Sequence, residues 1–307
     1  MIPSSKNLIH TNYRPDIDGL RAFSVFFVIG YHAFPEIFKA GFIGVDIFFV
    51  ISGYLISSII IGNLKNNSFS FLDFYIRRIR RIFPALILVL VVCFVFGWFS
   101  LFPIELKQLG KHIAGSAGFI SNFILWNESG YFDNAASTKP MLHIWSLGIE
   151  EQFYFIWPLI LWLIFKIRIN FLLSIIFLII VSFSFNVYEA KIDKVATFYS
   201  PLTRFWELLV GGLLAIIKDG YKGSINSKLN SNFLSILGVG LILLAFFFIN
   251  DESAYPGVLA LFPVIGSFFL ILAGNNSIFN QTILSNKVLV WFGLISFPLY
   301  LWHWPLI

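Results

Sequence analysis

A series of long apolar stretches constrains this chain more than any other feature of its sequence. A helix crosses the hydrocarbon core of a bilayer with about 17 to 25 apolar residues, and nine segments are close to this length. They lie at roughly 20–37, 43–62, 82–102, 143–165, 171–188, 202–217, 233–249, 257–273 and 289–307. Of the 307 residues, 58% are hydrophobic and only 12% are charged, which excludes an ordinary soluble protein. We therefore expect an all-α, polytopic integral membrane protein with about nine transmembrane helices, in one domain over residues 1–307.

Residues 104–126 are too polar at their start to form a tenth span. The segment carries Glu105, Lys107, Lys111 and His112, so its apolar part is short. We expect an interfacial or re-entrant helix here. If this segment does not cross and the N-terminus is cytoplasmic, the basic loops face the cytoplasm, as the positive-inside rule requires. The residues concerned are Arg77, Arg78, Arg80, Arg81, Lys166, Arg168, Lys218, Lys222 and Lys228.

Charge and cysteine content argue against two other classes of protein. The net charge of +5 comes from clusters near the ends of spans, which argues against nucleic-acid binding. The one cysteine, Cys93, excludes a disulfide framework and does not favour a metal site. The lipid bilayer is thus the partner that composition predicts.

Two ionisable residues in the first span are candidates for a functional site. Arg21 and His32 are eleven residues apart, which returns to nearly the same helix face and separates them by about 16 Å. Ionisable side chains inside spans cost several kcal/mol each, so they usually face a cavity or a partner.

Glu150 is predicted to lie at the depth of His32. Counted from the predicted span ends, His32 is about 18 Å above the inner surface and Glu150 about 10 Å below the outer one, in a core about 30 Å thick. A carboxylate at that level could orient the imidazole and stabilise its protonated form, as a general base requires. Glu150 shares its helix face with Tyr154, whereas the adjacent Glu151 does not, so we favour Glu150.

Four arginines in five positions occur in the sequence FYIRRIRRIFPAL. Arg77, Arg78, Arg80 and Arg81 could anchor the protein to anionic headgroups. They could also hold the phosphates of a cytoplasmic ligand, because guanidinium groups bind phosphate oxygens in pairs. The exclusive use of arginine favours the phosphate site modestly, since lysine would serve equally well as an anchor.

Asp46 and His303 also lie within predicted spans. Asp46 is near the outer end of the second span, where it could pair with a cation or reach the interface. His303 lies between Trp302 and Trp304 and fits an aromatic packing belt with a hydrogen-bonded histidine. Gly53 permits close approach between helices.

Six motifs in this order resemble the acyltransferase-3 family, which includes bacterial membrane O-acetyltransferases of O-antigen and peptidoglycan. They are YRPDIDGLRA, the ten residues between Arg21 and His32, GFIGVDIFFVISGYLI, FYIRRIRRIFPAL, HIWSLGIEEQFYFIWPL and LYLWHWPLI, and they extend over nearly the whole chain. The resemblance implies an inner-membrane enzyme that takes an acyl group, commonly acetyl from cytoplasmic acetyl-CoA, and passes it to an extracytoplasmic carbohydrate.

Motif matching assigns the functional residues of the first helix to Arg21 and His32, and the motif glutamate to Glu150. The arginines of the family fall on Arg77, Arg78, Arg80 and Arg81, and we add Arg14 to this group that binds the donor. Supporting residues are Asp18, Asp46, Tyr154 and His303.

Members with this N-terminal motif often continue into an extracytoplasmic domain of the SGNH hydrolase type. Because the sequence stops at Ile307, within or just after a helix, we expect it to be truncated. That domain would then lie outside the sequence, or acylation would occur on the membrane domain or a separate partner.

The mechanism that we expect has the phosphates of acyl-CoA on the arginine cluster and Arg21, with the thioester reaching His32. His32 would act as a general base or as a transient acyl carrier. Buried His, Arg and Glu would equally suit a proton-coupled transporter or a flippase. A third alternative is a membrane anchor without catalysis.

Overall fold

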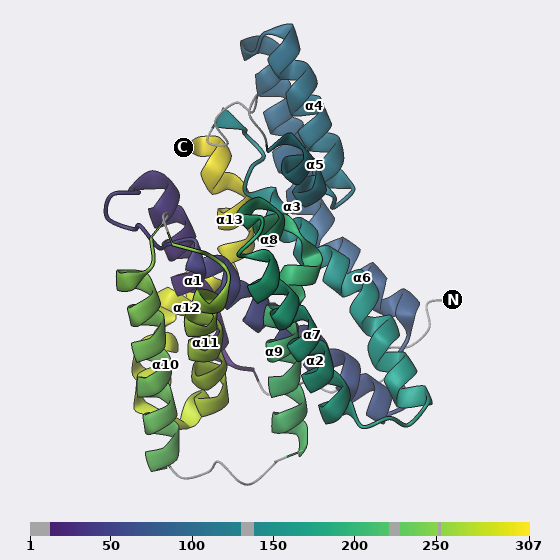
Figure 1. The fold of residues 1–307 in the computed structure, drawn as a ribbon, viewed down its shortest axis with the longest axis vertical. Coiled ribbons are helices and arrows are strands. Elements are labelled where there is room, and N and C mark those ends of the chain that lie inside the picture. The colour runs from purple at the N-terminus through teal and green to yellow at the C-terminus, as the bar shows by residue number, and fades with distance from the viewer. Residues whose placement is uncertain (1–12, 130–137, 221–227, 251–252) are drawn as a thin grey trace.

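The computed structural model describes residues 13–129, 138–220, 228–250 and 253–307, which form helices, turns and loops with no strand among them. Figure 1 shows a helical bundle with a narrower projection at one end. The long helices are α1 (Pro15–Ala33), α2 (Ile43–Lys65), α3 (Phe71–Ser100), α4 (Pro103–Ala117), α6 (Ile144–Lys166), α7 (Phe171–Glu189), α9 (Pro201–Gly220), α10 (Lys228–Phe248), α11 (Leu261–Ala273) and α13 (Ser296–Leu306). The shorter ones are α5 (Ser121–Glu128), α8 (Lys194–Tyr199), η2 (Val258–Ala260), η3 (Gly274–Asn276), η4 (Asn280–Leu284) and α12 (Lys287–Leu294).

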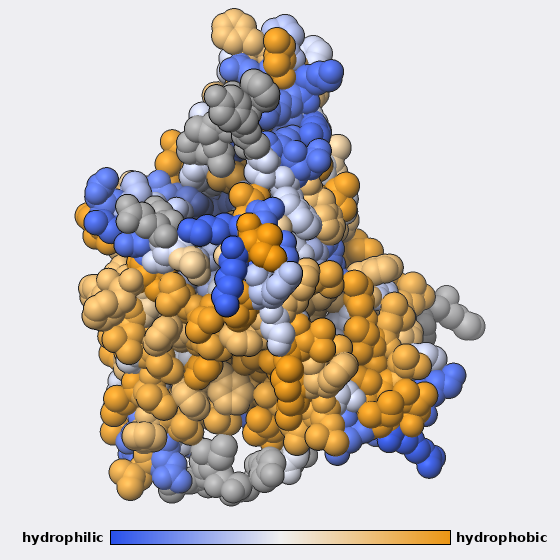
Figure 2. Space-filling view, in the orientation of Figure 1, coloured by the Kyte–Doolittle hydropathy of each residue, from blue (hydrophilic) through white to orange (hydrophobic). Residues whose placement is uncertain are grey.

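The chain is an all-α, multi-pass membrane protein. Within the described residues, seven helices are long and apolar enough to cross a membrane, and the bent pair α12–α13 would be an eighth. Helix α1, which carries Asp16, Asp18 and Arg21, is not among them. On the face drawn in Figure 2, an apolar band lies between hydrophilic surfaces at the two ends. The predicted fold class is confirmed, whereas the count of nine spans is not.

Helix α1 begins five residues before the predicted span and ends four residues before its predicted end. Pro15 occupies the first turn, where its missing N–H costs nothing, and Asp16 and Asp18 stabilise the positive end of the helix dipole. The helix ends at Ala33 because Phe34 precedes Pro35, and a residue before proline avoids the helical conformation. His32 therefore lies in the last turn of α1, nearer its end than predicted.

Helix α3 has 30 residues and is about 45 Å long, so the four arginines are part of the same helix as the predicted span. The predicted interfacial or re-entrant segment 104–126 forms two helices, α4 and α5, of which α4 packs back against α3. In Figure 1 these elements make the projection beyond the bundle. Neither is among the helices that could cross a membrane.

The last predicted span is not one straight helix. α12 and α13 meet at Ile295 with a bend of 69°. Pro298 lies in the first turn of α13 and has no N–H to donate to the carbonyl of Leu294, so one hydrogen bond of a continuous helix is missing at the bend. The bend directs α13 alongside α1, which it contacts.

Close contact between α2 and α9 organises the centre of the bundle. A Cβ atom added to Gly53 would lie 1.8 Å from the carbonyl oxygen of Leu208, and one added to Gly211 would lie 2.1 Å from that of Val50. Only glycine permits the two backbones to approach this closely. The predicted role of Gly53 in helix packing is confirmed.

Candidate active site

Two cavities lie along the inner helices and meet at two shared residues. The arginine cavity has a volume of about 190 Å³ and is lined from α1, α2, α3, α6 and α13 by residues that include Arg21, Arg78, Arg81 and Glu150. The histidine cavity has a volume of about 380 Å³ and is lined by residues that include His32 and His143. Val45 and Tyr300 line both cavities, so these two side chains separate them.

The arginine cavity holds more cationic than anionic side chains. Its charged lining residues are Arg21, Arg78, Arg81, Glu150 and Glu151. Arg21 is 3.6 Å from Asp18, and the guanidinium of Arg78 lies over the ring of Tyr154, 5.3 Å from its centre. Among the described residues, no carboxylate is within ion-pair distance of Arg78 or Arg81. Such unpaired guanidinium groups beside open space are suited to an anionic ligand.

Glu150 lines the arginine cavity and does not contact His32. Its carboxylate accepts hydrogen bonds from Ser52 and from Tyr154, the predicted neighbour on the same helix face. The prediction that Glu150 orients His32 is wrong, because the end of α1 raises His32 to the level of His143, seven residues before Glu150 along the chain. Glu151, which face counting had set aside, lines the same cavity, so the cavity is wider than one helix face.

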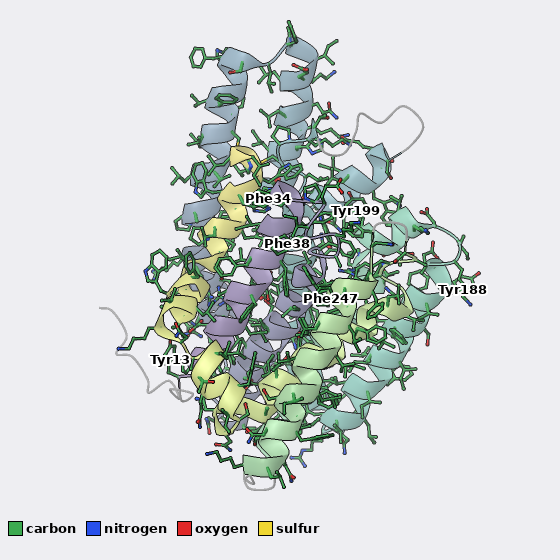
Figure 3. All side chains as sticks on the ribbon, turned by 90° about the vertical axis from the view of Figure 1, so that its left-hand side faces the viewer. Tyr13, Phe34, Phe38, Tyr188, Tyr199 and Phe247 are labelled. Atoms are coloured by element: carbon green, nitrogen blue, oxygen red, sulfur yellow. The ribbon has the colours of Figure 1, made fainter. Side chains whose placement is uncertain are left out.

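Three imidazoles come together beside the histidine cavity, from α1, from α13 and from the turn before α6. The ring of His32 is nearly parallel to that of His303, with centres 5.1 Å apart, and the ring centre of His143 is also 5.1 Å from that of His303. His32 and His303 are joined by a 2.9 Å hydrogen bond between Nδ1 and Nε2. Figure 3 shows α13 running beside α1, with Tyr13 at one end of α1 and Phe34 at the other. Within the described ranges, no three His, Cys, Asp or Glu side chains are arranged to hold a metal ion.

Tyr300 connects the two cavities through its hydroxyl group. The hydroxyl donates to the backbone carbonyl of His143 at 2.7 Å and shares a 2.5 Å hydrogen bond with Ser146. This fixes the ring at the boundary between the arginine cavity and the histidine cavity. A group passing from one cavity to the other would therefore pass Tyr300.

Three of the predicted donor-binding arginines lie outside the arginine cavity. Arg77 and Arg80 are exposed on α3 and do not line it, although Arg77 is one helical turn before Arg81. Arg14 makes two 2.7 Å hydrogen bonds to Asp16 and a third to the carbonyl of Ile271. Its guanidinium is thus used to fasten the start of α1 to α11.

Asp46 belongs to a closed ion cluster. Its carboxylate is 3.2 Å from the guanidinium of Arg204, which is 2.9 Å from Glu207, and it accepts a 2.5 Å hydrogen bond from Tyr255. The three charged residues are at most 1% exposed. Of the two alternatives that the sequence left open for Asp46, the structure has the ion pair.

Sequence reasoning missed His143, Arg204, Glu207 and Tyr300. Arg204 and Glu207 are ionisable residues inside an apolar segment, and this signal alone marks candidates. His143 directly precedes α6, where only the position of α13 makes it part of a site.

Comparison with known proteins identifies relatives over almost the whole chain. A family profile described as an acyltransferase domain matches residues 14–307. The YrhL protein of Bacillus subtilis is 37% identical over 97% of this chain and 49% of its own length. Peptidoglycan O-acetyltransferase OatA of Listeria monocytogenes is 36% identical over 96% of this chain and 49% of its own length.

O-acetyltransferase OatA of Staphylococcus aureus is 33% identical, again over 96% of this chain and 51% of its own length. The chain thus spans about half the length of these relatives. No solved structure matches it. The profile match, the six motifs and the helical membrane fold agree, and this chain belongs to the acyltransferase-3 family.

Proposed function

We propose that this chain acts as a membrane O-acetyltransferase, which takes acetyl from cytoplasmic acetyl-CoA and transfers it to a hydroxyl group of an extracytoplasmic carbohydrate. The bilayer concerned would be the bacterial inner membrane, with the N-terminus in the cytoplasm. The proposal depends on one observation above all, that the arginine cavity and the histidine cavity meet at Val45 and Tyr300. Peptidoglycan is the first acceptor to test, since the Listeria OatA relative is named for it. Lipopolysaccharide O-antigen and exopolysaccharide are the next acceptors to test.

In this proposal the arginine cavity binds the acetyl donor, acetyl-CoA. Arg21, Arg78 and Arg81 would hold the phosphates of acetyl-CoA, because charge-assisted bonds between guanidinium and phosphate are among the strongest in proteins. Arg21 and His32 are about 16 Å apart along α1, which an extended pantetheine arm can cover. Glu150 would hold Tyr154 and Ser52 beside this arm and thereby shape the donor site.

His32 would carry out the proton transfer. A lone pair on its imidazole takes the proton of the acceptor hydroxyl, whose oxygen forms a bond to the acetyl carbonyl carbon. The bond from that carbon to sulfur breaks, and the proton leaves with the thiolate as the free thiol of CoA. If His32 instead carries the acetyl group transiently, the same lone pair attacks the thioester carbon and the bond from that carbon to sulfur breaks, releasing the CoA thiolate. The acceptor hydroxyl oxygen then bonds to the acetyl carbon, the bond from that carbon to the imidazole breaks, and the hydroxyl proton goes to the thiolate.

His32→Ala tests this assignment in membranes that contain the full chain. With radiolabelled acetyl-CoA, we expect transfer of acetyl to fall at least about 100-fold, the usual contribution of a general base. His112→Ala is the matched control, since His112 is a buried histidine of α4 outside both cavities. Full transfer by His32→Ala protein that inserts normally would refute the assignment.

The same membranes separate the enzyme from the transporter alternative. An acetyltransferase releases free CoA thiol in proportion to the acetyl transferred. A proton-coupled transporter or flippase would move its substrate without acetyl-CoA and in response to a pH gradient. Gradient-driven uptake without release of CoA would overturn the proposal.

A further inference from the structure

The hydrogen bonds of His303 determine which of its nitrogens carries the proton. Its Nδ1 is 2.6 Å from the backbone carbonyl of Tyr300. A carbonyl oxygen only accepts hydrogen bonds, so Nδ1 of His303 must be the donor. In the neutral ring the other nitrogen, Nε2, then carries a lone pair.

The position of the proton on His303 also determines which nitrogen of His32 is protonated. Nε2 of His303 is 2.9 Å from Nδ1 of His32. Because Nε2 of His303 can only accept, Nδ1 of His32 must donate, and Nε2 of His32 holds the lone pair. The two hydrogen bonds thus select one of the two neutral tautomers of His32.

Pro305 leaves a backbone carbonyl of α13 free to bind His143. It has no N–H to donate to the carbonyl of Leu301 four residues earlier, which leaves that oxygen free within α13. Nε2 of His143 donates to it at 3.1 Å. His143 is therefore held with its ring against that of His303, and α13 is fastened to the start of α6.

We propose that His303 is the positioning residue of His32, holding it in the tautomer whose Nε2 is free to accept a proton. The proposal deepens the proposed function and rests on it for the role of His32. When His32 becomes protonated, the lone pair on Nε2 of His303 still accepts from Nδ1 and stabilises the imidazolium. A neutral imidazole thus takes the part that a carboxylate plays in a Ser-His-Asp triad.

Kinetics of acetyl transfer provide the first test. In His303→Leu the ring of His32 loses its acceptor, and we expect kcat to fall about 10- to 100-fold, as when the partner that orients a functional imidazole is removed. KM for acetyl-CoA should stay within about twofold, because the donor phosphates bind in the other cavity. His303→Gln should recover most of kcat, since its amide oxygen can accept from Nδ1 of His32. His112→Gln, outside both cavities, serves as the control.

Nitrogen NMR of histidine-labelled protein provides a test that needs no activity. The signals of His32 are identified by their absence from His32→Gln protein. We expect Nε2 of His32 to have the shift of an unprotonated nitrogen in the wild type and in His303→Gln, and an averaged shift in His303→Leu. If His303→Leu fails to insert, the shift of Nε2 in the wild type still decides the tautomer.

Two results would overturn the positioning role: a protonated Nε2 on His32 in the wild type, or wild-type kcat in His303→Leu. Absence of acetyl transfer by the wild type would instead contradict the proposed function, and the NMR result would stand independently of it.

Discussion

The protein contains two groups of arginine and carboxylate residues inside the helical bundle that differ in burial and in ion pairing. In the closed ion cluster, Arg204 lies between Asp46 and Glu207, at 3.2 and 2.9 Å, with no more than 1% of any of the three exposed. In the arginine cavity, Arg78 and Arg81 have no ion-pair partner among the described residues, and open space of about 190 Å³ adjoins them. The same residue types therefore stabilise the fold in the closed ion cluster, whereas in the arginine cavity they are available to bind a ligand.

The closed ion cluster is linked to the walls of both cavities. The guanidinium of Arg204 lies over the rings of Phe49, Trp145 and Phe198, at 5.5, 5.8 and 5.9 Å from their centres. Phe49 lines the arginine cavity, whereas Trp145 and Phe198 line the histidine cavity. We infer that the cluster fixes the shape of the site without touching a ligand.

The largest effect should come from breaking the closed ion cluster. Arg204→Met leaves the carboxylates of Asp46 and Glu207 buried without a cation, and we expect a loss of about 3 to 5 kcal/mol of stability. Thermal unfolding of the detergent-solubilised protein measures it. In the triple variant with Asp46→Asn and Glu207→Gln added, no buried charge remains, so most of the stability should return. Unchanged stability in Arg204→Met would remove the distinction between the two groups.

A smaller and different effect is expected in the arginine cavity. Arg78→Gln with Arg81→Gln should raise KM for acetyl-CoA about 10- to 100-fold, since a hydrogen bond to a charged group contributes about 1.5 to 3 kcal/mol. Thermal stability should change less than in Arg204→Met, because neither guanidinium is within ion-pair distance of a carboxylate among the described residues.

The chain supplies a matched control for this pair. Arg77→Gln with Arg80→Gln removes the same charge from exposed positions of the same helix, outside the cavity. KM should then remain near that of the wild type. Equal KM increases in both double variants would mean that the whole arginine run attracts the donor through its net charge.

Length and hydropathy predicted most of the membrane helices to within a few residues, as with α2, α6 and α7. These spans are set by local properties, since an apolar stretch of sufficient length must be helical in a bilayer. Hydropathy did not predict the start of α1, because Pro15, Asp16 and Asp18 form a polar first turn. The resulting error in the depth of His32 produced the wrong pairing with Glu150.

The contact between His32 and His303 joins residues 271 positions apart, and no periodicity in the sequence specifies such a contact. It depends on the bend at Ile295, which turns α13 toward α1. Both histidines were recognisable as unusual within apolar segments, but only the packing of α1 against α13 makes them partners.

The smallest effect is expected for a third group of charged residues, which lies outside the bundle. It belongs neither to the closed ion cluster nor to the arginine cavity. Glu128 at the end of α5 is bound by Lys111 at 2.6 Å, Lys139 at 3.1 Å and His112 at 2.9 Å. Although burial alone would raise the pKa of Glu128, the hydrogen bonds from Lys111 and Lys139 lower it below its usual 4.5. Burial lowers the pKa of His112 below 6.5, despite the nearby carboxylate of Glu128.

Acidification should therefore loosen α4 and α5 while leaving the closed ion cluster intact. Below pH 6.5 the unfolded segment takes up a proton at His112 that the folded one resists, and below pH 4.5 the same holds for Glu128, so both groups destabilise the fold as the pH falls. Hydrogen exchange in α4 and α5, corrected for its intrinsic pH dependence, should show lower protection at pH 4 than at pH 7. Glu128→Gln should remove the part of this change that occurs below pH 4.5, because the variant has no carboxylate to titrate. Equal protection at both pH values in the wild type would show that these contacts contribute nothing measurable, as is common for partly exposed ion pairs.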